Sequence, residues 1–121
     1  EYPKQYCYPS RSINQSLEND KYCSPIMENL EQEIKLINES YDLVAKKNHL
    51  LKSENGNKFF EILTKHPDIE LYEDNSHPNK YGSFLNACVF YQMLTKKKAS
   101  DLKFIGEIEP NTAELLKRVA E

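Results

Sequence analysis

Asp74 and His77, three residues apart, are the residues of this chain whose types and spacing could do chemistry. The segment around them is polar, and His77 precedes Pro78, which disfavours the helical region, so a loop is expected. In a loop, this spacing can bring the carboxylate to the imidazole Nδ1–H. The carboxylate then fixes the tautomer, leaves Nε2 free to take a proton from a nucleophile, and stabilises the imidazolium. The pair predicts two thirds of a nucleophilic hydrolase triad. An aspartate that caps a turn beside a surface histidine is the ordinary alternative.

The overall composition excludes several classes of function. The chain has 121 residues, with 16 lysines and arginines against 19 aspartates and glutamates, and a formal charge of −3. That balance excludes a strongly basic nucleic-acid binder as the default. No run approaches the roughly eighteen apolar residues of a membrane-spanning helix. The 39% of hydrophobic residues suffices for one modest core, so a single domain over residues 1–121 is expected.

The sequence predicts neither a cofactor nor a metal. Only three glycines are present, and they stand far apart: Gly56, Gly82 and Gly106. This spacing excludes the glycine-rich phosphate loops of nucleotide-binding proteins. The histidines are scattered, and no two cysteines have zinc-site spacing. Cys7 and Cys23 could pair in an oxidising compartment, whereas Cys88 lies in an apolar run and is expected to be a core residue.

Helices must position the candidate pair. Residues 24–48 predict a helix, with Ser24 as N-cap and Pro25 as first residue. Apolar residues at steps of three and four form one stripe along it, expected to face the core. The stripe comprises Ile26, Leu30, Ile34, Ile37, Tyr41 and Val44.

The rest of the chain predicts shorter elements. Further helices are expected over residues 58–65, over residues 81–94 and from Pro110 onward. The helix predicted over residues 81–94 is apolar on most sides, so we expect it to be buried in a larger body. Residues 49–51 are a weak strand candidate, and residues 55–57 are a turn signal. Residues 69–72 alternate and could be a short strand or an extended lead-in. Residues 1–23 are expected to be irregular.

Several segments together resemble one known family. They are residues 66–72 (HPDIELY), 74–79 (DNSHPN) and 82–91 (GSFLNACVFY), followed by residues 108–116 (IEPNTAELL). In this order and spacing they look like the C-terminal part of SGNH (GDSL-type) hydrolases. They are more closely similar to a bacterial branch in which the catalytic Asp-x-Ser-His-Pro precedes a glycine and a Leu-x-Ala-Cys-Val-Phe-Tyr helix. The resemblance covers about residues 60–120.

The resemblance implies both a fold and an activity. The fold would be a three-layer α/β/α sandwich with a flavodoxin-like parallel sheet, of which residues 24–121 would be the helix-rich C-terminal α/β portion. Asp74 would orient His77, and His77 would be the general base for a serine nucleophile. The activity would be ester hydrolysis, on acyl groups of carbohydrates or lipids, with no cofactor or metal. The compartment would be periplasmic or secreted.

The chain departs from the family where the nucleophile should be. It contains no Gly-Asp-Ser and no Gly-x-Asn-Asp block. Ser76 belongs to the base loop, and Ser83 is expected to cap a helix. The chain is therefore interpreted as a C-terminal fragment that supplies Asp74 and His77, with the missing N-terminal portion or a second copy as partner. The alternatives are a non-catalytic remnant or interaction module, and a small independent helical protein.

Overall fold

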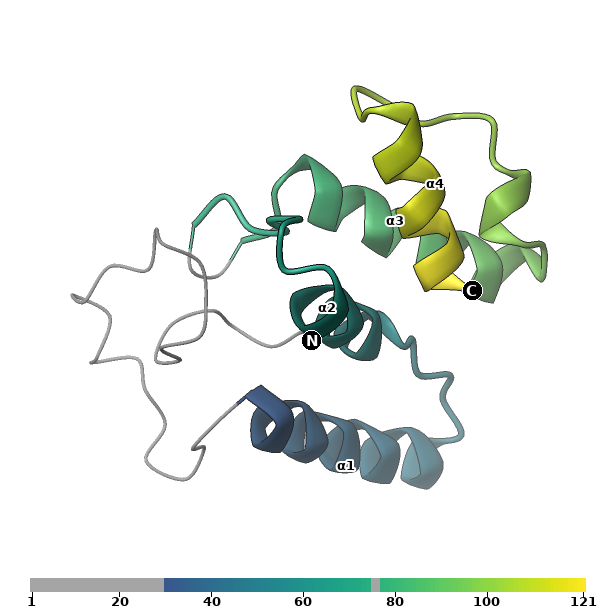
Figure 1. Ribbon diagram of the computed structural model, residues 1–121. Coiled ribbons are helices and arrows are strands. Elements are labelled where there is room, and N and C mark those ends of the chain that lie inside the picture. Colours follow the sequence, from purple (N-terminus) through teal and green to yellow (C-terminus); the bar gives the residue numbers. More distant parts are fainter. Residues whose placement is uncertain (1–29, 75–76) are drawn as a thin grey trace.

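The computed structural model describes residues 30–74 and 77–121, and this part of the chain is helical (Figure 1). Helices account for 67% of the described residues. The elements are α1 (Leu30–Asn48), α2 (Asn55–Lys65), α3 (Lys80–Thr95), the short 3-10 helix η2 (Ala99–Asp101) and α4 (Pro110–Ala120).

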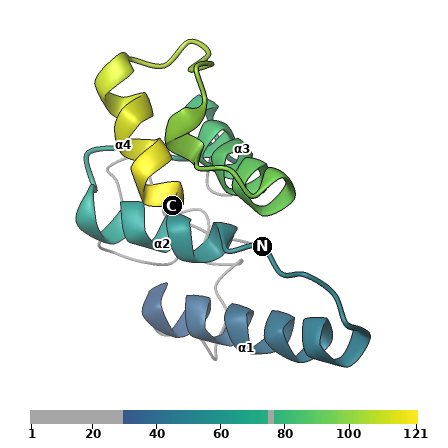
Figure 2. The ribbon, with the colours of Figure 1, turned by 90° about the vertical axis from the view of Figure 1, so that its right-hand side faces the viewer.

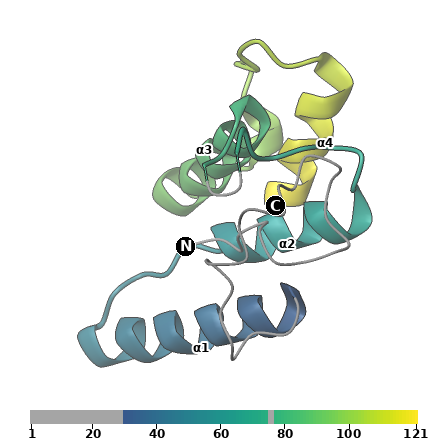
Figure 3. The same cartoon turned by 90° about the vertical axis from the view of Figure 1, so that its left-hand side faces the viewer.

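The helices form a stack in which α2 lies in the middle. Turned views show α1 on one side of α2, and α3 and α4 together on the other (Figures 2 and 3). Among the described elements, α1 contacts α2 alone, whereas α2, α3 and α4 all contact one another and η2 packs on α3 and α4. The loop carrying Asp74 and His77 joins α2 to α3.

One apolar core joins α2, α3 and α4. The buried side chains come from these helices and from the segments between them: Phe59, Ile62, Leu71, Tyr72, Phe84, Leu85, Cys88, Val89, Ala99, Ile108, Ala113, Leu116, Val119 and Ala120. Removing such side chains from water is the main force that holds the helices together. The rings of Phe59 and Tyr72 meet edge to face with centroids 5.6 Å apart, which ties the α2–α3 loop to α2.

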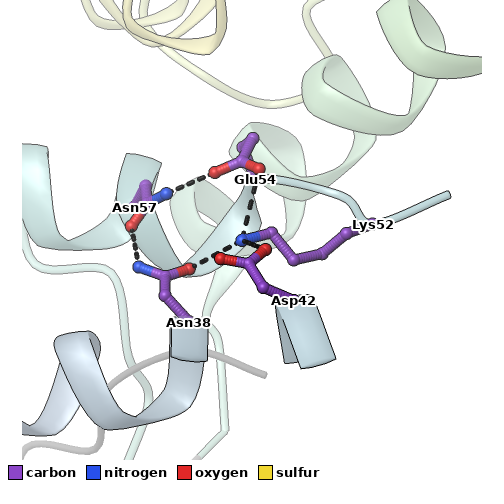
Figure 4. A network of polar contacts seen from close by, with 5 residues as sticks. All are labelled: Asn38, Asp42, Lys52, Glu54 and Asn57. Carbon is purple, nitrogen blue, oxygen red and sulfur yellow. Dashed lines mark hydrogen bonds and ion pairs between the residues drawn. The ribbon is translucent and has the colours of Figure 1, made fainter. Parts of the chain in front are cut away.

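A network of polar contacts joins α1 to the segment that begins α2 (Figure 4). Lys52 Nζ lies 2.6 Å from Asp42 Oδ1 and donates to Asn38 Oδ1 at 3.1 Å. Asn38 Nδ2 in turn donates to Asn57 Oδ1, and Asn57 Nδ2 donates to Glu54. The Lys52 ammonium therefore belongs to one network of hydrogen bonds and ion pairs that connects α1 with the start of α2.

The expected three-layer α/β/α fold is wrong for the described residues, which contain no β-strand. The first strand candidate follows directly on the end of α1 and forms no strand, and its Leu50 and Leu51 are 61% and 77% exposed. The second contributes only an isolated antiparallel bridge between Tyr72 and Pro78. A parallel sheet needs neighbouring strands that share a ladder of hydrogen bonds, and residues 30–74 and 77–121 supply none.

Most helix predictions are confirmed, and one turn prediction is wrong. The long first helix is present from Leu30 to its predicted end at Asn48, and residues 24–29 lie outside the described residues. Helices α3 and α4 form where predicted, and Pro110 opens α4. Residues 55–57, expected to be a turn, are instead the first turn of α2. There Asn55 is buried and its Nδ2 donates to Asn86 Oδ1 of α3, so a tertiary contact outweighs the local turn preference.

Among the described residues of the apolar stripe on the first helix, only Ile34 is buried. Ile34 is 5% exposed, but Tyr41 and Val44 are 44% and 53% exposed. The reason is that α2 is the only described helix that α1 contacts. Helix α3 is likewise not enclosed, since Phe90 and Leu94 are 43% and 73% exposed.

Candidate functional site

The α2–α3 loop has two arms, residues 70–73 and residues 77–79, which lie against each other at the base of the candidate pair. Tyr72 and Pro78 form an antiparallel bridge, Glu73 N donates to His77 O at 3.0 Å, and Asn79 N donates to Leu71 O at 2.9 Å. Leu71 is fully buried and Tyr72 is 4% exposed. The base of the loop is therefore part of the core, whereas the side chains of Asp74 and His77 are exposed.

Asp74 and His77 are in direct contact, as their spacing predicts. Asp74 Oδ1 accepts the backbone N–H of His77 at 2.6 Å. Asp74 Oδ2 lies 2.6 Å from His77 Nδ1. An ionised carboxylate can only accept hydrogen bonds, so Nδ1 carries the proton and donates it to Asp74. In a neutral imidazole, Nε2 is then the free base, which is the tautomer that a triad histidine uses.

The pair is exposed, and its electrostatics follow from the aspartate. The side chain of His77 is 71% exposed and that of Asp74 is 51% exposed. The hydrogen bond to Asp74 raises the pKa of His77 above its usual value, and the negative charges of Asp74 and Glu73 act in the same direction. The imidazolium is therefore stabilised, which suits a group that accepts a proton during a reaction.

No serine among the described residues is hydrogen-bonded to His77. Ser83 lies in α3, and its backbone N–H donates to Asn79 O at 2.8 Å. It is not the helix cap that the sequence suggested, because Asn79 is the N-cap of α3. Ser76 lies outside the described residues.

Asn79, for which the sequence predicted no role, lies at the junction of the loop and α3. Asn79 Oδ1 accepts the backbone N–H groups of Tyr81 and Gly82, and Nδ2 donates to Glu70 O and Tyr72 O. A signal for the capping role was available, since asparagine is among the best N-cap residues. The contacts to Glu70 and Tyr72 join residues nine and seven positions apart, and no local sequence pattern predicts them.

The remaining candidate groups do not form a second chemical site in residues 30–74 and 77–121. Cys88 is buried as predicted, and burial raises the pKa of its thiol to about 11, so it stays protonated and unreactive near neutral pH. Within this part of the chain, no group of three or more histidine, cysteine or acidic side chains could hold a metal ion. Cys7 and Cys23 lie outside the described residues.

One hollow lies between α1 and α2, away from the candidate pair. It measures about 140 Å³, and its lining combines Asn38 and Tyr41 of α1 with Leu51, Lys52 and Gly56. The ammonium of Lys52 is engaged by Asp42, Asn38 and Glu54, so this hollow offers no free cation to a ligand. We therefore assign the candidate site to the α2–α3 loop.

Comparison with known proteins does not place the chain in a family. No family model, no curated protein and no solved structure matches it. None of the helices in the described part of the chain is long and apolar enough to cross a membrane.

Proposed function

We propose that Asp74 and His77 are the acid–base half of a serine ester hydrolase. The single observation that carries the proposal is the 2.6 Å contact between Asp74 Oδ2 and His77 Nδ1. It leaves Nε2 without a hydrogen-bond partner among the described residues. His77 would take the proton of a serine hydroxyl as that hydroxyl attacks the ester carbonyl. It would then give the proton to the leaving alcohol.

The serine would come from outside the described residues. A triad acts as a unit, so His77 alone would contribute little to rate without a positioned hydroxyl. The exposure of His77 also means that another surface must cover the pair, bring the nucleophile and exclude water during reaction. The motif resemblance favours acyl esters of carbohydrates or lipids as the substrate class.

The proposal is tested with the complete gene product that contains these 121 residues. The assay is hydrolysis of a short-chain aryl ester, such as p-nitrophenyl acetate, with and without a fluorophosphonate serine inhibitor. We expect inhibitor-sensitive turnover that His77→Ala lowers by about 100-fold or more, the range of a general base. Asp74→Asn should lower kcat less, because the histidine remains but loses its orienting carboxylate.

Exposed histidines hydrolyse activated esters slowly on their own, so a matched control is needed. His49 is also exposed, and among the described residues it has no acidic partner. Its φ of 54° lies in the left-handed region, which asparagine tolerates, so His49→Asn is the appropriate replacement. Turnover that falls equally in His49→Asn and His77→Ala, or that ignores the inhibitor, would contradict the proposal.

A second candidate function is a non-catalytic interaction module. It is favoured by exposed large apolar side chains on α1 and the segment after it: Leu43 at 69%, Val44 at 53%, Leu50 at 61% and Leu51 at 77%. Such side chains gather on surfaces that bind partners. His77→Ala separates the two functions. It abolishes hydrolysis if the protein is an ester hydrolase, and it changes nothing if the protein is an interaction module.

A further inference from the structure

We propose that Asn79 is the positioning residue of the Asp74–His77 pair, and that its side-chain amide holds the two arms of the α2–α3 loop in the register at which the pair meets. The catalytic meaning of this inference rests on the proposed function. The geometry on which it stands, and its first readout, do not depend on ester hydrolysis.

The side chain of Asn79 spans the loop. On the arm that precedes the pair, Asn79 Nδ2 donates to Glu70 O at 2.7 Å and to Tyr72 O at 3.4 Å. On the helix that follows, Asn79 Oδ1 accepts from Tyr81 N at 2.8 Å and from Gly82 N at 3.2 Å. Both amide hydrogens and both oxygen lone pairs are therefore used. One side chain binds the incoming arm and the start of α3 at the same time.

The backbone around Asn79 reinforces this link. Asn79 N donates to Leu71 O, and Asn79 O accepts from Ser83 N, which begins the hydrogen bonding of α3. A Cβ atom at Gly82 would collide with Leu71 O and lie 2.9 Å from Pro78 Cβ. The incoming arm therefore lies directly against the first turn of α3, where only glycine leaves room for it.

The pair lies at the surface, above a buried base. Asp74 accepts the backbone N–H of His77 and contacts its ring, but both side chains are half or more exposed, whereas Leu71 and Tyr72 are buried. Water competes with contacts between exposed charged groups, and such contacts hold side chains in place only weakly. The backbone of the two arms, which Asn79 joins, therefore contributes to the alignment of Asp74 with His77.

Serine at position 79 separates capping from positioning. Serine is a good N-cap, so Asn79→Ser keeps an acceptor for the start of α3, but it removes the amide that donates to Glu70 O and Tyr72 O. The charged groups that raise the pKa of His77 are Asp74 and Glu73, and this change leaves both in place. Any change in the titration of His77 then reports its alignment with Asp74.

The experiment measures the pKa of His77 by NMR titration in wild type, Asn79→Ser and Asp74→Asn, with far-UV circular dichroism as a check on folding. We expect Asn79→Ser to keep its helical signal and to move the His77 pKa at least halfway from the wild-type value to the Asp74→Asn value. Asn79→Thr, a second replacement that retains a capping oxygen, should behave alike. In the ester assay, Asn79→Ser should lower kcat and leave KM unchanged.

Tyr81→Phe is the matched control. Tyr81 lies in the same first turn of α3, but its hydroxyl donates to Glu109 at 2.8 Å and does not touch the loop. Its removal should leave the His77 pKa at the wild-type value. A wild-type His77 pKa in Asn79→Ser overturns the positioning role, whatever the enzyme assay shows. Absence of hydrolysis in wild type, with the expected shift in Asn79→Ser, overturns the proposed function and leaves the positioning role standing.

Discussion

Asp74 holds His77 at two points. One carboxylate oxygen accepts the backbone N–H of His77 and the other lies against its Nδ1, each at 2.6 Å. The backbone bond closes the turn, and the side-chain contact orients the ring. The same carboxylate therefore makes the usual turn contact of an aspartate and also contacts the histidine ring, with one oxygen for each.

The contact between Asp74 and His77 makes the stability of the fold depend on pH. The folded-state pKa of His77 is raised, mainly by its hydrogen bond to Asp74. The resulting stabilisation is fully present below the unfolded pKa and is lost as the pH rises through the folded pKa. Asp74→Asn should therefore lower the free energy of unfolding more at about pH 5.5 than at about pH 8.5. Urea denaturation at the two pH values measures this difference.

Asp101→Asn serves as the control for that comparison, because Asp101 is exposed and lies outside the loop. Its effect should be small at both pH values. The amide oxygen of asparagine can still accept the backbone N–H of His77 at both pH values, so the difference between the two losses reports the ring contact. If Asp74→Asn lowers the free energy of unfolding equally at both pH values, the contact with the His77 ring contributes nothing to stability.

Gly82→Ala should destabilise the fold by about 1–3 kcal/mol, the usual cost of forcing extra atoms into a filled space. The added Cβ would collide with Leu71 O and lie 3.1 Å from Phe59 Cζ, and a backbone oxygen in a buried segment cannot move aside easily. Thermal unfolding measures the effect. Ser83→Ala, at the next and exposed position, should change the melting temperature little. Equal stability of the two variants would show that α3 and the loop are not in close contact.

Lys52→Met should loosen α1 and leave the rest of the helices in place. Lys52 contacts Asp42 and Asn38 of α1, and α1 lies outside the core that joins α2, α3 and α4. We expect faster amide hydrogen exchange over Leu30–Asn48 and unchanged exchange in α3. Lys65→Met, which removes an exposed pair with Glu61, is the control and should leave α1 unaffected. Exchange that rises equally in α1 and α3 would contradict this division.

Cys88 should resist alkylation in the native protein. Its thiol is fully buried, and its pKa is raised to about 11, so almost no thiolate forms at about pH 8. Iodoacetamide treatment followed by peptide mass spectrometry should show Cys88 modified only after denaturation. Rapid native modification of the peptide that contains Cys88 would show that α3 is not packed as described.

The sequence predicted the helices better than their surroundings, and the reasons differ from one element to another. Pro110 and the apolar period of residues 81–94 are local signals, so α3 and α4 formed as expected. The start of α2 was missed because the burial of Asn55 against Asn86 is a contact across 31 positions. The strand candidates failed because a strand requires a partner, and no local pattern states whether one is present.

The candidate pair was predicted for the same reason that α3 was. Asp74 and His77 are three residues apart, so their contact has a local signal in the sequence. Asn79 was missed as a structural link because its partners Glu70 and Tyr72 are set by how the loop folds back. The nucleophile that the proposal needs was not found in the sequence, and no described serine is hydrogen-bonded to His77.

The central claim is that His77, oriented by Asp74, activates a serine. The most direct measurement is the rate at which a fluorophosphonate probe labels the complete gene product, with the labelled residue identified by mass spectrometry. We expect covalent labelling of one serine in wild type and in His49→Asn, and loss of that labelling in His77→Ala. Equal labelling of wild type and His77→Ala, or no labelled serine in wild type, would contradict it.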